Sequence, residues 1–242
     1  MFEAQWQDEV VESAANTALG ILGRDPTLER VFDLTHRAMA STSRLVAGLL
    51  AHAPEGAVAC KAGCDHCCHV VVGVTAPEAL TIFDHLQRSR SAPELARLAA
   101  RVATVHERTR GLSSAERFSP EYPCIFLEAG RCSIYEVRPL ACRGMNSLDA
   151  GECETRLRDP ETRAEFASKG GGHLFVEPIR AFRAVSAGLQ VALLELYRLD
   201  MTPLDLTATM RLLLQDQPSL GDAWMAGQQP FEAAVLGGQR PP

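Results

Sequence analysis

The sequence predicts a mostly α-helical fold, in which a helical scaffold surrounds an irregular, cysteine-rich, metal-binding centre. Long segments at both ends of the chain repeat apolar residues with the period of an amphipathic helix. All eight cysteines lie between residues 60 and 153, and residues 118–150 have the weakest periodicity. A chain of 242 residues is long enough to bury a substantial core.

The N-terminal part, residues 1–55, predicts two helices that pack on the core. The first covers residues 2–19, with Gly20 and Gly23 as stop signals. The second follows Asp25 as the N-cap and Pro26 as the first helical residue, and continues to about residue 52.

Residues 56–153 are predicted to form the cysteine-cluster metal-binding domain. Within it, "VVVGV" predicts a short extended segment, and helices are expected over residues 76–89 and 92–111. The residue spacing of a capping box occurs at the start of each of these helices, at Thr75–Glu78 and Ser91–Glu94, and a third time at Ser113–Glu116.

Residues 154–230 predict C-terminal helices of the same globular unit, followed by a flexible tail at residues 231–242. Helices are expected at 152–168, 178–199 and 203–216, and the Gly-rich "KGGGH" at 169–173 predicts a hinge. The helix at 178–199 carries an apolar stripe that predicts core packing, made of Ile179, Phe182, Val185, Leu189, Leu193 and Leu196.

Composition limits the classes of function. A net charge of −6 argues against general binding of nucleic acid or of an anionic membrane. No apolar run is long enough to cross a bilayer, and the segment from Met1 to Asn16, without Lys or Arg, is unlike a signal peptide. We therefore expect a cytoplasmic protein without nucleic-acid or membrane partners. Since disulfides do not persist in a reducing cytosol, dense cysteine indicates metal or redox chemistry.

The cysteines form two groups that are far apart in the sequence. "CKAGCDHCCHV" contains Cys60, Cys64, Cys67 and Cys68, and the second group is Cys124, Cys132, Cys142 and Cys153. Thiolates are soft donors that suit zinc, iron–sulfur clusters and copper(I). We predict that these cysteines are metal ligands, with a non-ligand role also open for Cys153.

The adjacent Cys67 and Cys68 bear on the size of the centre. In an extended backbone neighbouring side chains point to opposite faces, so such a pair would serve one small ion poorly. The doublet therefore favours a centre larger than one ion, two centres close together, or one ligand beside a buried thiol. The spacings fit neither a zinc ribbon nor a bacterial ferredoxin.

Charged and aromatic neighbours of the cysteines have two interpretations each. Arg138 and Arg143 are candidate cofactor contacts that lower thiol pKa values and donate hydrogen bonds to sulfur; alternatively, they pair with Glu136 or are exposed. His66 and His69 are candidate ligands, but solvent-facing or supporting roles are favoured.

The motifs "CKAGCDHCCHVVVGVTAPEAL" and "PCIFLEAGRCSIYEVRPLACRG" together resemble the YkgJ-type CxxCxxCC family. The resemblance covers about residues 60–145; the first gap here is C-x3-C, and Cys153 has no clear place in the shared pattern. It implies a domain that binds zinc or iron. Relatives of that family include flagellin lysine methylase, but the methylase activity is not carried over, because nothing outside the cysteine region resembles that enzyme.

Three functions remain open at this point. The favoured one is an iron–sulfur protein of the four-iron type, with a redox or modification-related role and a redox or protein partner. The second is a zinc protein whose metal organises the fold so that the helices bind a partner. The third is a protein that sequesters or delivers metal. No residue is assigned a catalytic role.

Overall fold

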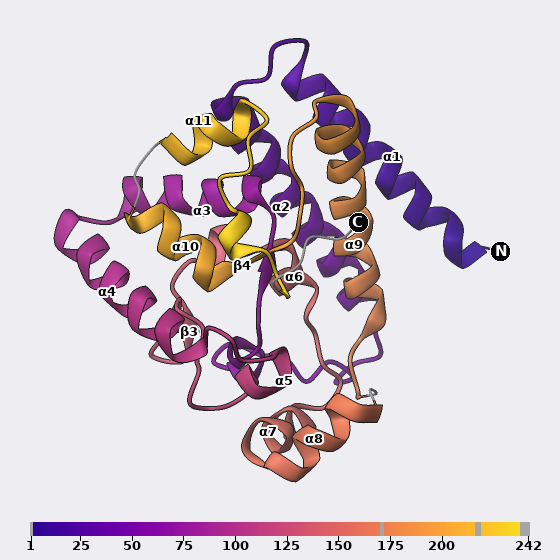
Figure 1. Ribbon diagram of the computed structural model, residues 1–242. Helices are drawn as coiled ribbons and strands as arrows, with labels where there is room; N and C mark the ends of the chain where they lie inside the picture. Colours follow the sequence, from indigo (N-terminus) through magenta and orange to yellow (C-terminus); the bar gives the residue numbers. More distant parts are fainter. Residues whose placement is uncertain (1, 170–171, 216–218, 238–242) are drawn as a thin grey trace.

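The computed structural model describes residues 2–169, 172–215 and 219–237 (Figure 1). Helices dominate this part of the chain, which confirms the predicted fold class. The α-helices are α1 (Phe2–Leu22), α2 (Leu28–Ala51), α3 (Ala76–Ser89), α4 (Ala92–Thr109), α5 (Ser114–Arg117), α6 (Leu140–Gly144), α7 (Ala150–Arg158), α8 (Pro160–Lys169), α9 (Val176–Gln190), α10 (Leu206–Gln215) and α11 (Ser219–Met225). The shorter elements are the 3-10 turns η1 (His66–His69), η2 (Tyr135–Val137) and η4 (Glu232–Ala234), the π-helical turn η3 (Val191–Leu196), and the strands β1 (Gly73–Val74), β2 (Leu127–Glu128), β3 (Arg131–Cys132) and β4 (Leu204–Asp205).

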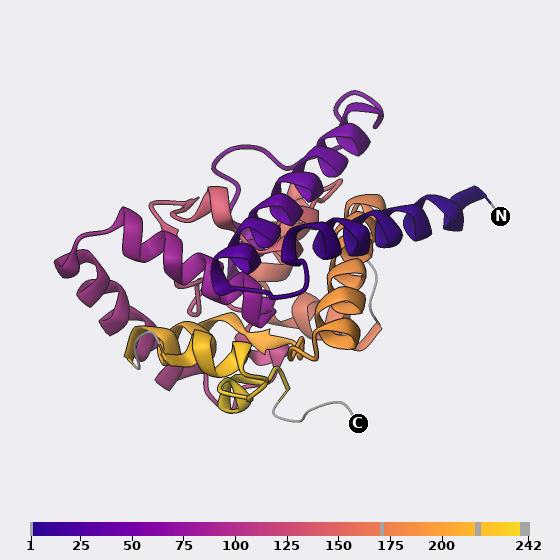
Figure 2. The ribbon, with the colours of Figure 1, turned by 90° about the horizontal axis from the view of Figure 1, so that it is seen from above.

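Three long helices, α1, α2 and α9, pack against one another on one side of the molecule (Figures 1 and 2). The close approach of α1 to α9 requires Gly188, because a Cβ there would lie 2.4 Å from the Val11 carbonyl oxygen and 2.6 Å from the Ala14 Cβ. The N-terminal end of α1 projects beyond these neighbours in both views.

On the other side α10 packs on α3 and α4, and α3 packs on α2. All three predicted capping boxes are present, since the carboxylates of Glu78, Glu94 and Glu116 accept the N–H groups of Thr75, Ser91 and Ser113 at 2.8, 2.8 and 2.7 Å. The core between the two sides is aliphatic and aromatic, and its largest fully buried side chains include Trp224, Phe126, Leu22, Leu34 and Met39.

Two short antiparallel pairs connect distant segments. Strands β1 and β4 pair with Gly73 opposite Asp205, which joins the segment after the first cysteine group to the start of α10. Strands β2 and β3 form a hairpin with Leu127 opposite Cys132. The predicted extended "VVVGV" segment is thus a strand only at its end.

Two helix boundaries near the N-terminus differ from the prediction. Helix α1 continues to Leu22 and ends before Gly23, whose φ of +63° a helix does not accommodate. Helix α2 is capped by the Thr27 hydroxyl rather than by Asp25, so Pro26 precedes the helix instead of beginning it.

The single helix predicted over residues 152–168 is wrong, because the chain forms α7 and α8 there. Pro160 disfavours helical backbone at the residue before it, and Asp159 adopts an extended conformation that ends α7. The Asp159 carboxylate then accepts the Thr162 N–H at 3.1 Å, as an N-cap of the next helix does.

The predicted apolar stripe at 178–199 is correct over most of its length, with Val185, Leu189 and Leu193 buried. Leu196 is the exception, because 56% of its surface is exposed. The helix changes to π geometry at Val191, which adds a residue per turn and rotates later side chains away from the stripe.

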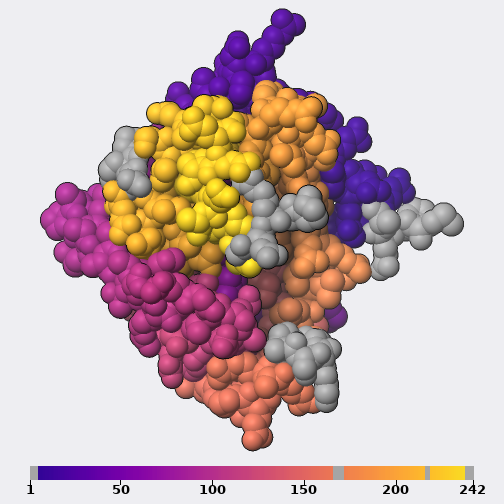
Figure 3. Space-filling view, viewed as in Figure 1, coloured from indigo at the N-terminus to yellow at the C-terminus, as the bar shows by residue number. Residues whose placement is uncertain are grey.

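The start of the expected tail is packed rather than flexible. Phe231 and Ala234 are 3% and 1% exposed, and Val235 forms a bridge with Leu204. Figure 3 shows the C-terminal segment, in yellow, packed against the orange segment that precedes it. Residues 238–242 of the predicted tail, and 170–171 of the predicted hinge, lie outside the described residues. The proposed division at residues 55, 153 and 230 stays a prediction.

Within the described ranges, the helices are too short or too polar to pass through a bilayer.

Candidate metal centre

The first cysteine group lies on a loop and a single 3-10 turn. Cys60 and Cys64 are in the loop, where the Cys64 N–H donates to the Lys61 carbonyl oxygen at 3.0 Å. Cys67 and Cys68 lie on η1, and the Cys68 N–H donates to the Asp65 carbonyl oxygen at 2.7 Å. This backbone differs from the extended one that we expected for the doublet.

The second cysteine group is held by packed elements. Cys124 precedes the β2–β3 hairpin, and Cys132 lies on β3. Arg101 of α4 donates to the carbonyl oxygens of Cys124 and Leu127, at 3.1 and 2.6 Å, which fastens the hairpin to the scaffold. Cys142 lies on α6, and Cys153 on α7.

The fold brings the two groups together. The Cys124 N–H donates to the Cys68 carbonyl oxygen at 2.7 Å, which joins the two groups by a direct backbone bond. In the described residues all eight cysteines are free thiols, so no disulfide framework forms.

Four thiols lie close enough to influence one another, and we call Cys67, Cys124, Cys132 and Cys142 the inner thiol set; Cys67 is exposed and the other three are partly buried. Burial raises the pKa of the Cys142 thiol well above its usual range, and it is raised further by the nearby thiols of Cys124, Cys67 and Cys132. Burial likewise raises the pKa of Cys124 to about 11. A hydrogen bond with Cys68 is the main cause that raises the pKa of the Cys67 thiol. Such thiols keep their protons until a cation replaces them.

Three further cysteines, Cys60, Cys64 and Cys153, form a second group that we call the outer thiol set. The Ser147 N–H donates to the Cys60 Sγ at 3.2 Å. Burial raises the pKa of the Cys60 thiol, the Ser147 bond opposes that rise, and the Cys64 and Cys153 thiols add to it. The Cys67 thiol also raises the pKa of Cys60, so Cys67 lies near both thiol sets.

Arg143 holds the loop that leads to Cys142. The residue is 6% exposed, and its guanidinium donates to the carbonyl oxygens of Arg138 (3.0 Å) and Glu136 (2.6 Å) and to the Ser43 hydroxyl (2.6 Å). Burial lowers the pKa of Arg143 to about 10. Its bonds in the structure thus go to oxygen, and it does not pair with the Glu136 carboxylate.

Arg138 has a different environment. Its guanidinium lies 3.9 Å from the centre of the exposed Tyr135 ring, and its buried Nε has no hydrogen-bond partner among the described residues. Its positive charge partly offsets the rise in the pKa of the Cys132 and Cys67 thiols, so it lies close to the inner thiol set. An unpartnered donor beside several thiols fits an acceptor that carries negative charge.

The two histidines beside the doublet differ from each other. His69 is buried, and its Nδ1 lies 3.3 Å from the Ser119 carbonyl oxygen. The His66 Nδ1 lies 3.9 Å from the Asp65 carboxylate. Neither contact involves a thiol.

The thiols lie too far apart for a preformed mononuclear site. Zinc–sulfur bonds of about 2.3 Å place tetrahedral ligands about 3.8 Å apart. Among the described residues, the one group of three or more potential ligand atoms within 4.8 Å of one another is Asp149, Glu152 and His173, which contains no cysteine.

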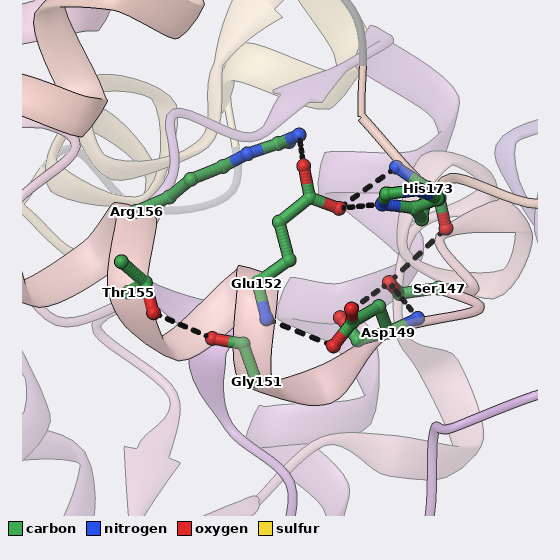
Figure 4. A network of polar contacts seen from close by, with 7 residues as sticks. All are labelled: Ser147, Asp149, Gly151, Glu152, Thr155, Arg156 and His173. Atoms are coloured by element: carbon green, nitrogen blue, oxygen red, sulfur yellow. Dashed lines mark hydrogen bonds and ion pairs between the residues drawn. The ribbon is translucent and has the colours of Figure 1, made fainter.

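No sequence pattern indicates that group, and its contacts have a structural explanation (Figure 4). The Asp149 carboxylate caps α7 by accepting the Glu152 N–H at 2.9 Å. Glu152 pairs with Arg156 and accepts bonds from the His173 N–H (2.9 Å) and Nδ1 (2.6 Å). Burial alone would raise the pKa of Glu152, but the His173 bonds lower it. The network holds the start of α7 against the segment at His173.

Comparison with known families bears directly on these thiols. Residues 59–161 match a family model named CxxCxxCC. Its description is "putative zinc- or iron-chelating domain". The match confirms the resemblance predicted from the sequence and supports metal binding by this segment. The CxxCxxCC match extends past Cys153, which the sequence motifs alone left unplaced. Searches of curated proteins and of solved structures found no significant match.

Proposed function

We propose that the CxxCxxCC segment carries an iron–sulfur cluster, bound mainly by the inner thiol set, and that the protein has a redox or modification-related role. The observation that carries the proposal is the gathering of Cys67 with Cys124, Cys132 and Cys142 beside the unpartnered Arg138 Nε. Thiolates are the usual ligands of such clusters, and a cluster of the four-iron type takes four of them.

The spacing of the thiols supports a centre with several metal atoms. The inner set sits on a packed hairpin, on α6 and on η1, so its separations are fixed by the fold. Ligands of a cluster bind different iron atoms and need not approach one another as closely as ligands of a single zinc ion.

Arg138 and Arg143 would have separate roles in this site. Arg138 supplies a positive charge and an N–H donor that is unpartnered among the described residues. A hydrogen bond from this donor to a cluster sulfur would raise the reduction potential of the cluster. Arg143 keeps the Cys142 loop in place through its three oxygen contacts. When bound, the cluster would supply one-electron transfer.

The same chemistry suggests where the protein acts and what it meets. Free thiols and an iron–sulfur cluster are compatible with a reducing compartment, so we propose a cytoplasmic location and a redox protein as partner. A zinc-binding role that organises the fold is the second candidate, because the family description names zinc beside iron.

The test is the measurement of iron, zinc and acid-labile sulfide per chain, with a visible spectrum, on protein purified without oxygen. We expect brown protein with matched iron and sulfide, and loss of both in Cys142→Ser. The control Ser133→Ala, next to Cys132 on the hairpin, should keep them. Colourless protein with stoichiometric zinc and no sulfide would refute the cluster and favour the second candidate.

A further inference from the structure

The fold fastens the inner and the outer thiol sets to different parts of the scaffold. The hairpin that carries Cys132 is bound to α4 through Arg101. Helix α6, which carries Cys142, packs closely on α9, since a Cβ at Gly144 would lie 2.3 Å from the Phe182 ring. These contacts leave Cys124, Cys132 and Cys142 little freedom to move toward the outer set.

The outer set depends on α7 instead. The loop before Cys60 is tied to Ser147, because the Ala59 N–H donates to the Ser147 carbonyl oxygen at 2.8 Å. The Ser147 hydroxyl in turn donates to the Asp149 carbonyl oxygen at 2.9 Å, and Asp149 caps the helix that carries Cys153. Helix α7 also packs against η1. The bonds through Ser147 and Asp149 thereby hold Cys60 near the start of the helix that carries Cys153.

A second observation indicates that the Cys60 sulfur is prepared as a ligand. The Ser147 backbone N–H points at the Sγ from 3.2 Å, and an amide donor stabilises the thiolate over the thiol. Amide-to-sulfur bonds of this kind accompany metal-bound thiolates as supporting contacts. Cys60 is also exposed, so a metal ion can reach it from solvent.

We propose that the outer thiol set is a second metal centre, separate from the inner one, which binds a single soft divalent ion such as Zn²⁺ or Fe²⁺ through Cys60, Cys64 and Cys153. Cys60 and Cys64 lie in a loop without regular structure, so they can close around one ion with less change to the fold than the anchored inner set. Binding exchanges the thiol protons for the ion, and the fourth coordination position stays open to solvent.

This division also explains the cysteine doublet. Cys67 lies near both sets, so η1 is the element shared by the two centres. The inference rests on the proposed cluster only for the nature of the inner centre, since two separate metal sites could equally hold two zinc ions.

The test compares paired substitutions in the full chain, each reconstituted without oxygen with ferrous iron and sulfide and then titrated with Co²⁺. Cobalt bound by thiolates has an intense charge-transfer absorption, so it reports the outer site directly. In Cys60→Ser/Cys153→Ser we expect sulfide to stay at the wild-type level, iron to fall by no more than the one ion of the outer site, and the cobalt absorption to disappear. In Cys132→Ser/Cys142→Ser we expect loss of iron and sulfide while a single cobalt ion still binds.

The exposed neighbour Glu154, whose carboxylate pairs with Arg158, provides the matched control Glu154→Gln. Far-UV circular dichroism checks that each variant keeps its helices. Loss of iron and sulfide in the outer variant, with the helices intact, would mean one joined centre. Unchanged cobalt binding in that variant would mean that the outer thiols are not ligands. If the wild type binds two zinc ions, no sulfide, and each pair removes one ion, the cluster proposal fails while the two centres stand.

Discussion

Replacing the buried Glu78 should destabilise the link between the scaffold and the helix that carries Cys142. Glu78 is 4% exposed, and its two carboxylate oxygens accept hydrogen bonds from two different elements. One accepts the Leu140 N–H at 2.9 Å, where α6 begins, and the other accepts the N–H and the hydroxyl of Thr75, each at 2.8 Å. The side chain thus caps α3 and holds α6.

The magnitude follows from these bonds. In Glu78→Ala the buried Leu140 N–H loses its acceptor, which costs about 1–3 kcal/mol. Loss of the cap costs about 1 kcal/mol more. We therefore expect the free energy of unfolding to fall by about 2–4 kcal/mol, a large part of the stability of a typical domain.

Glu94→Ala is the matched control, because Glu94 has the same capping-box bonds to Ser91 but is exposed and does not bond to a second element. The assay is urea unfolding of metal-free, reduced protein, followed by circular dichroism, with metal content measured in parallel. Glu78→Ala should lose more stability and more metal than Glu94→Ala. Equal losses in the two variants would refute the role of the Leu140 bond.

The effect of Glu78→Ala should depend on pH. Burial raises the pKa of Glu78, against the opposing bonds from Leu140 and Thr75. The folded state then binds more protons than the unfolded state between the ordinary carboxyl pKa of about 4.3 and the raised value, so this contribution to stability falls as pH rises through that window. The difference between wild type and Glu78→Ala should accordingly be greater at the acidic end.

Two further perturbations test the scaffold and the thiols. Gly188→Ala should cost about 1–3 kcal/mol in urea unfolding, because its Cβ would meet the Val11 carbonyl oxygen at 2.4 Å, whereas Gly48→Ala, with open space around it, should be neutral or stabilising. Because burial raises the pKa of Cys142 and Cys124, metal binding must release the protons of both thiols. We therefore expect the apparent affinity for Zn²⁺ to weaken by about a hundredfold or more for each pH unit of acidification. Competition with a chelator measures this affinity. A pH-independent affinity would contradict binding at these thiols.

The parts of the fold that depend on neighbouring residues could be predicted from the sequence. The capping boxes at Thr75 and Ser91 define α3 and α4, because each involves residues only three positions apart. The end of α7 before Pro160 follows from the same kind of local rule, because a proline disfavours helical backbone at the residue before it. The single helix predicted over residues 152–168 did not take this rule into account. The π turn at Val191 had no such signal, and it turns Leu196 outward.

The site was predictable as a set of residues but not as an arrangement. Soft donors at close spacing identify metal ligands by their chemistry, whichever way the chain folds. The Ser147 N–H that approaches Cys60, and the Glu78 carboxylate that holds α6, act across long sequence separations and have no local pattern. The backbone at the doublet also differs from the expected one, because η1 forms where an extended segment is predicted.

These long-range contacts bear on which metal role the fold favours. A metal that organises a protein is needed where the ligand loops have few other contacts. Here Arg143 joins the Cys142 loop to Ser43 of α2, and Glu78 joins α6 to α3. Hydrogen bonds within the chain already position the inner thiols, so the geometry of these thiols does not depend on a metal. A metal bound there is not needed to fold the site and can serve chemistry at the centre. The loop of Cys60 and Cys64 has fewer such bonds, and there metal binding and loop order should be coupled.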